Sequence, residues 1–171
     1  VSSAASDVYK RQGDNKLLSS GWDKQTCIWD RKTGVLLQRY DCTEDDASEI
    51  TVIAGNPSLT RAIVARADQT VAAVDTADLS TIAAWATPDG STISAMNLES
   101  HSLLMGGSGG AIYRQTFFND QLNAQPQPAK RIAKVKGRVI AITDLAAADH
   151  TTREIAAVTQ PGKIVRCLLY T

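Results

Sequence analysis

Short apolar runs separated by polar turns organise most of the chain. The runs are rich in β-branched residues and are bounded by Gly, Asn-Pro and Pro-Asp-Gly sequences. None of them keeps the apolar period of a helix over three turns. The pattern therefore predicts an all-β chain with strands joined by tight turns. The expected strands are residues 17–20, 26–30, 35–40, 50–54, 61–66, 70–75, 80–86, 92–98, 102–106, 111–117, 131–135, 139–144, 154–159 and 163–166.

An internal repeat of about 43 residues groups these strands. At an offset of 45 positions, Asp23 aligns with Asp68, and Asp30 aligns with Asp75. A group of four short strands in each repeat is typical of a β-propeller blade. A β-sandwich is the alternative architecture, because it also has short strands at regular spacing, but the repeat favours the propeller.

Residues 17–34 (LLSSGWDKQTCIWDRKTG) resemble the second half of a WD40 repeat. This stretch has an Asp in a tight turn, a Trp-Asp pair at the end of a strand and a Thr-Gly turn after that pair. The chain departs from the WD40 pattern because no Gly-His dipeptide opens a blade and the His of the family's buried polar network is missing. The residues to which the resemblance gives structural roles are Asp23, Trp29, Asp30, Asp68 and Asp75.

The resemblance extends over residues 13–166, which corresponds to about three and a half four-stranded blades. It implies an incomplete WD40-type β-propeller, since propellers of this family usually close with about seven blades. Two terminal segments are set apart from the fold. Residues 1–12 are expected to be a non-native or disordered arm and residues 167–171 a non-native tail, because both resemble translated sequencing-adapter sequence.

The charge balance and the candidate chemistry narrow the functional classes. The chain has 18 Lys and Arg against 18 Asp and Glu, so it lacks the overall positive charge of many nucleic-acid-binding proteins. Its two histidines, His101 and His150, lie in turn-like segments, and residues 106–110 (GGSGG) read as a hairpin turn. No Walker loop or metal-ligand spacing occurs. We therefore expect no enzymatic activity, cofactor, bound metal or small-molecule substrate.

The cysteines and the lack of long apolar runs bear on location. Cys27, Cys42 and Cys167 form neither an even disulfide set nor a metal-ligand spacing, which favours a reducing compartment. No apolar run approaches the roughly 18 residues of a membrane span, and the first residues do not resemble a secretory signal. The expected location is intracellular, either nuclear or cytoplasmic, without a membrane partner.

Residues 130–138 carry five cationic side chains within nine positions. If this basic segment is extended, alternation places Lys130, Lys134, Lys136 and Arg138 on one face, with Ala133 and Val135 on the opposite, packed face. One interpretation is the exposed outermost strand of a blade, and the other is a stripe that contacts the phosphates of RNA. The candidate RNA or partner contacts are Lys130, Lys134, Lys136 and Arg138.

Two further segments read as loops. Residues 41–49 are strongly acidic and are expected to form a solvated loop between the first two blades, with a partner-binding loop as the alternative. Residues 119–129 are polar and contain proline, as is typical of a projecting loop.

A propeller without catalytic residues indicates a binding platform, here a non-catalytic WD40 scaffold for protein–protein interactions in a multiprotein complex. Residues 68–71, 93–101 and 106–113 resemble WD-repeat subunits of the pre-60S ribosome-maturation complex. The first two blades also resemble non-catalytic WD subunits of tRNA guanine-N7 methyltransferases. Both resemblances imply nuclear residence and an RNA-proximal basic segment. The remaining alternative is the targeting propeller of an enzyme or ubiquitin ligase whose other domains lie outside this chain.

Overall fold

The computed structural model describes residues 11–12, 15–20, 25–41, 48–55, 60–99, 102–117, 127–146, 153–160 and 162–169. These residues form strands, turns and a single 3-10 turn at Pro88–Gly90. In this part of the chain, no helix is long and apolar enough to cross a membrane. The strands are β1 (Arg11–Gln12), β2 (Lys16–Ser20), β3 (Gln25–Asp30), β4 (Leu36–Asp41), β5 (Ile50–Gly55), β6 (Arg61–Arg66), β7 (Thr70–Asp75), β8 (Thr81–Ala86), β9 (Ile93–Leu98), β10 (Ser102–Gly107), β11 (Ala111–Thr116), β12 (Lys130–Lys134), β13 (Val139–Ala146), β14 (Arg153–Thr159) and β15 (Lys163–Leu169).

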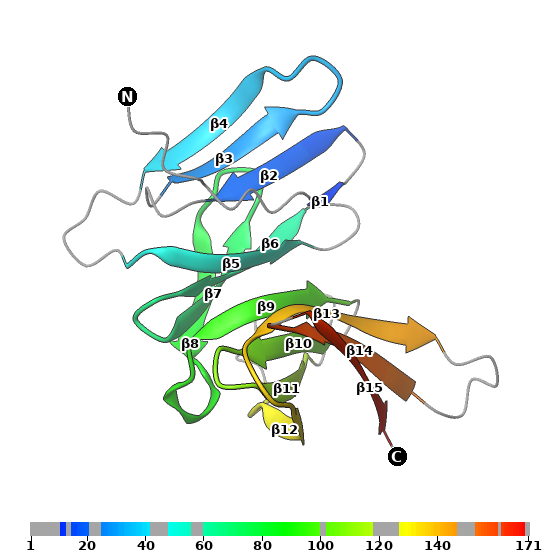
Figure 1. Ribbon diagram of the computed structural model, residues 1–171. Helices are drawn as coiled ribbons and strands as arrows, with labels where there is room; N and C mark the ends of the chain where they lie inside the picture. The colour runs from blue at the N-terminus through cyan, green and yellow to red at the C-terminus, as the bar shows by residue number, and fades with distance from the viewer. Residues whose placement is uncertain are drawn as a thin grey trace, which may run out of the picture. The chain divides into compact units, whose positions relative to one another are not determined.

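The strands form four antiparallel sheets, in each of which consecutive strands pair with one another (Figure 1). The sheets are β1–β4, β5–β8, β9–β12 and β13–β15. The first two sheets belong to one compact unit, residues 1–86, and the other two belong to a second unit, residues 87–171. Every expected strand is present, and the all-β prediction with blade-like groups of strands is confirmed.

Both terminal segments that the sequence analysis set apart contribute to strands. Arg11 pairs with Leu18, so β1 adds a fourth strand to the three that were expected for the first sheet. Strand β15 continues to Leu169, and Cys167 packs against the core of the second unit. The non-native origin of these segments stays a prediction.

The core of the first unit is built from the facing apolar sides of its two sheets. Leu18 and Ile28 are cross-strand partners in the first sheet, so their side chains share one face. They join Ile53 and Val64 of the second sheet in a single buried cluster. In that second sheet, the four middle residues of both β6 and β7 are buried, as expected for the two central strands of the sheet.

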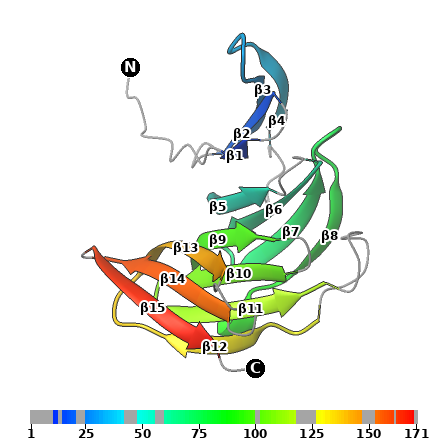
Figure 2. The ribbon, with the colours of Figure 1, turned by 90° about the vertical axis from the view of Figure 1, so that its right-hand side faces the viewer.

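The core of the second unit joins β9–β12 to β13–β15. Strand β13 lies beside β9 and β10, with β14 and β15 following it in the last sheet (Figure 2). Val139 and Ile155 pack there against Leu104 and Ile112. Gly106 permits this close approach, because a Cβ atom at that position would overlap the side chain of Val139.

Candidate functional site

The repeat residues Asp30 and Asp75 end equivalent strands and hold the turns that follow. Asp30 Oδ1 accepts hydrogen bonds from Lys32 N at 2.9 Å and from Thr33 N at 2.7 Å. The backbone and hydroxyl hydrogen bonds of Thr33 lower the pKa of Asp30 below its ordinary value of 3.8. Asp75 Oδ1 accepts from the backbone N–H of residue 77 at 2.8 Å, and its other oxygen pairs with the Arg61 guanidinium. Both carboxylates are therefore engaged in holding the backbone and neighbouring strands.

Asp68 stabilises the hairpin turn between β6 and β7. Its Oδ1 accepts hydrogen bonds from Thr70 N at 2.9 Å and Thr70 Oγ1 at 2.7 Å, an arrangement typical of Asx turns. The backbone N–H of Asp68 donates to Ser48 Oγ at 2.9 Å. Asp23, which aligns with Asp68 in the repeat, lies outside the described residues.

Trp29 connects the two central strands of the first sheet. Its indole N–H donates to Ser19 Oγ at 2.8 Å, and the side chain is half-buried. Because buried indoles usually find such a partner, the contact fits a residue that holds β2 against β3.

The basic segment, residues 130–138, lies at the edge of a sheet. Strand β12 pairs only with β11 in its four-stranded sheet, so the expected outermost strand is confirmed. The exposed cationic side chains are Lys130, Arg131, Lys134, Lys136 and Arg138.

A β-bulge interrupts the alternation in this segment. Ala133 pairs with Ile112, whereas Arg131 pairs with the next residue of β11, so Ile132 is an extra residue. Consequently Lys130 and Lys134 lie on opposite faces of the sheet, and the expectation of one shared face is wrong for Lys130. Lys136 and Arg138 follow the end of the strand and belong to the connection to β13. The expected packed side is confirmed, because Ala133 is half-buried and Val135 is buried.

An ionisable cluster in the second unit was not anticipated from the sequence. It consists of Glu99, Ser102, Arg114 and Asp144. Arg114 Nη2 donates to Asp144 Oδ2 at 2.9 Å, with side chains 18% and 17% exposed, and this ion pair joins β11 to β13. Ser102 Oγ donates to Glu99 Oε2 at 2.8 Å. Arg114 Nε and Asp144 Oδ1 are buried without a hydrogen-bond partner among the described residues.

The cluster shifts the titration of Glu99. Burial raises the pKa of Glu99 above its ordinary value of 4.5. The hydrogen bond from Ser102 acts against this shift, and the neighbouring Asp144 carboxylate reinforces it. The cluster therefore combines an ion pair between two sheets with a carboxyl group that protonates more readily than an ordinary Glu.

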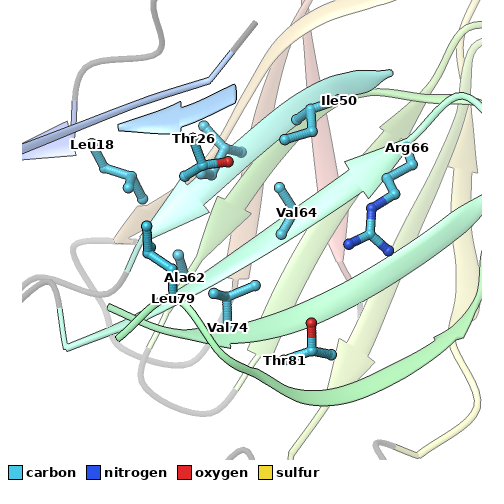
Figure 3. A pocket seen from close by; sticks show the side chains of 10 residues that line it. Leu18, Thr26, Ile50, Ala62, Val64, Arg66, Val74, Leu79 and Thr81 are labelled. Carbon is cyan, nitrogen blue, oxygen red and sulfur yellow. The ribbon is translucent and has the colours of Figure 1, made fainter. Parts of the chain in front are cut away.

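A small cavity of about 20 Å³ lies in the core of the first unit. It has room for about one water molecule, whereas small-molecule sites usually have a volume of at least about 300 Å³. The guanidinium group of Arg66 is directed in among the lining side chains (Figure 3). Its Nε atom is buried and has no hydrogen-bond partner among the residues that the structure describes. The lining residues are Leu18, Thr26, Ile50, Ile53, Ala62, Val64, Arg66, Val74, Leu79 and Thr81.

Several candidates from the sequence lie outside the described residues. They include both histidines, His101 and His150, together with Cys42 and residues 42–47 of the acidic segment. Most of the polar segment 119–129 is also outside. Within the described part of the chain, no group of three or more His, Cys, Asp or Glu side chains could hold a metal ion.

The arrangement of sheets is shared with solved structures that have little sequence in common with this chain. The computationally designed Ika4 protein matches 99% of the chain over 96% of its own length, with a TM-score of 0.66 and 15% identity. Saccharomyces cerevisiae Sqt1 matches 96% of the chain with a TM-score of 0.70 and 9% identity. BamB from Moraxella catarrhalis matches 96% of the chain with a TM-score of 0.64 and 14% identity. The fold is that of a β-propeller.

The chain spans less than half of the two natural structures, covering 45% of Sqt1 and 43% of BamB. It spans nearly all of Ika4, of which it covers 96%. No protein-family model and no curated protein sequence matches the chain. The comparisons with known proteins therefore show its fold alone.

The sequence analysis missed the ionisable cluster because its members share no motif. Arg114 and Asp144 are 30 positions apart and lie on different sheets. The available signal was one charged residue in each of two largely apolar strands, Arg114 in β11 and Asp144 in β13. Such a signal marks a polar position but does not identify its partner.

Proposed function

We propose that this chain is a non-catalytic β-propeller module that binds other proteins as a scaffold subunit of a multiprotein complex. The observation that carries the proposal is that the aspartates of the repeat stabilise turns and strands. Asp30, Asp68 and Asp75 accept hydrogen bonds from turn backbone or pair with a neighbouring strand. A sheet framework stabilised in this way leaves its loops and edges for contacts with partners.

The fold supports this function by analogy, because propellers in general present loops and strand edges to partners. The WD40 assignment adds a narrower proposal. It rests on the sequence of residues 17–34 and on the turns at Asp30 and Asp75, which occupy equivalent positions in their sheets. A role in ribosome maturation, with a nuclear location, rests only on the resemblance of residues 68–71, 93–101 and 106–113.

Copurification tests the scaffold proposal. The tagged chain, expressed at native level in cells of its source, is expected to elute in size-exclusion chromatography with stoichiometric protein partners. Mass spectrometry of that fraction identifies those partners and shows whether ribosome-maturation factors or a tRNA methyltransferase are among them. Recovery of the chain free of stoichiometric partners, together with turnover of a substrate by the purified chain, would contradict the proposal.

A further inference from the structure

Charge is distributed unequally between the two units despite the overall balance. Residues 1–86 contain nine Lys and Arg against twelve Asp and Glu, whereas residues 87–171 contain nine against six. In the second unit, Arg114 and Arg166 pair with Asp144 and Glu154. Most of the remaining cations are exposed, so the positive charge of this unit is available at its surface.

The exposed cations gather where three turns of the second unit meet. Val135 N donates to Gly110 O at 2.8 Å, and Gln160 N donates to Arg138 O at 2.9 Å. These bonds join the turn at 108–110, the connection at 135–138 and the turn that precedes β15. We call the exposed cations of this region and of the adjoining strand β12 the basic rim. Its members are Lys130, Arg131, Lys134, Lys136, Arg138 and Lys163.

Acidic side chains do not neutralise the basic rim among the described residues. None of its six cations forms an ion pair with another described residue. Asp89, an acidic residue of the same unit on the turn before β9, contacts the Tyr113 hydroxyl instead, from which it accepts a hydrogen bond at 3.3 Å. The rim is therefore a set of exposed, unneutralised positive charges along β12 and the turns beyond its C-terminal end, with Lys130 on the opposite face of the sheet from Lys134. Such charges attract anionic partners at ordinary ionic strength.

The backbone beside the rim favours an extended peptide as the anion. Strand β12 is the last strand of its sheet, so its outer edge has no strand partner in the described part of the chain. Unpaired N–H and C=O groups on such an edge can accept an added strand. The rim is less suited to single-stranded nucleic acid, whose bases stack on exposed aromatic side chains. The described aromatic residues of this unit, Tyr113 and Phe117, are buried.

We propose that the basic rim is a docking surface for an extended acidic segment of a partner protein, which pairs with the outer edge of β12. This inference rests on the proposed scaffold function and names the class of partner that the site takes. Lysine and arginine on an edge strand repel a second copy of the same strand. The same charges attract a strand rich in Asp and Glu, so the edge selects its partner by charge.

Binding of a synthetic peptide to the purified full chain tests the proposal. The probe is a labelled peptide of alternating Glu and Thr, and fluorescence anisotropy measures its Kd at low and high salt. We expect binding that weakens as salt rises, with hydrogen-exchange protection of the amides of Lys130–Lys134. Two comparison probes are the same peptide with alternate backbone nitrogens methylated and an oligouridylate RNA of equal charge.

The variant Lys134→Gln with Lys136→Gln is expected to weaken peptide binding roughly fivefold, since two exposed charge contacts are lost. The matched control, Arg31→Gln with Lys32→Gln, removes the same charge from an exposed turn of the first unit and is expected to leave the Kd unchanged. Equal affinity of the rim variant, equal binding of the methylated peptide, or tighter binding of the RNA would overturn the proposal. Because copurification measures the scaffold function separately, failure of this docking surface is distinguishable from failure of that function.

Discussion

The hairpin turns at residues 67–69 and 108–110 have similar backbone geometry but different chemistry. The last residue of each turn has a positive φ, +69° at Gln69 and +86° at Gly110. In both turns its N–H donates to the residue before the turn, to Arg66 O at 3.2 Å and to Gly107 O at 3.0 Å. The first turn adds hydrogen bonds to the Asp68 carboxylate, whereas the second uses glycine.

The surroundings of the two turns explain this difference. Gln69 is exposed, so a side chain in a left-handed conformation costs strain but does not have to fit into a packed interior. Gly110 is buried against the connection to β13, where a Cβ atom would approach Gly137 O to 2.7 Å and overlap Val135 O. Local geometry thus permits several residues at this turn position, and tertiary packing decides which of them can be accommodated.

Substitution of Gly110 is expected to have the largest effect. Gly110→Ala should lower the free energy of unfolding by about 3 kcal/mol, because it adds left-handed strain to a steric overlap with backbone. Urea denaturation measures the loss. Gly109→Ala is the matched control, since its Cβ would have only the Lys134 ammonium within reach, at 3.9 Å. Equal stability of the two variants would show that packing around Gly110 is not the deciding factor.

Removing the carboxylate cap of the first turn should have a smaller effect. Asp68→Ala is expected to cost about 1 kcal/mol of unfolding free energy, because Thr70 loses two hydrogen bonds to an exposed side chain. Asp68→Asn keeps an acceptor oxygen and should retain most of the stability. If the alanine variant unfolds at the same urea concentration as the parent chain, the backbone alone maintains this turn.

Placing glycine in the first turn would make it more like the second. Gln69→Gly is expected to raise the free energy of unfolding by about 0.5 kcal/mol, because relief of left-handed strain outweighs the entropy of glycine in the unfolded chain. Gln69→Ala keeps the strain and serves as the control. A loss of stability in the glycine variant would mean that Gln69 makes a favourable contact that outweighs its strain.

The smallest expected effect is a change in how stability depends on pH. In this respect Glu99 of the ionisable cluster is expected to behave in the opposite way to the turn aspartates. The raised pKa of Glu99 means that its contribution to stability is fully present below about pH 4.5 and is lost as the pH rises through the folded pKa. Glu99→Gln should therefore show a smaller decline of Tm than the parent chain as the pH rises above 4.5. Parallel profiles would contradict this assignment.

The turn carboxylates provide the opposite behaviour as an internal comparison. Hydrogen bonds lower the pKa of Asp30 and also that of Asp78, where the Ser80 hydroxyl is the main cause. Their contribution to stability is present above their ordinary pKa of 3.8 and is lost as the pH falls through the lowered values. Their titration therefore lies below the range in which Glu99 is tested.

Strand positions were predictable because they depend on local pattern. Strand β7 is a short apolar run bounded by the turn residues Asp68 and Asp75, and both features can be read along the chain. The bulge at Ile132 was not predictable, because it depends on how β12 pairs with β11. That single extra residue moved Lys130 to the face opposite Lys134 and altered the predicted basic stripe.

The sequence by itself determined the all-β class, the repeat, the turn aspartates and the position of the basic segment, because each follows from residues close together along the chain. Only the tertiary structure decided that Arg114 meets Asp144, that Gly110 must lack a side chain and that three turns bring the cations of the basic rim together. These features join residues from different strands and sheets. Their energies depend on distance and burial in space, which the spacing of residues along a chain does not encode.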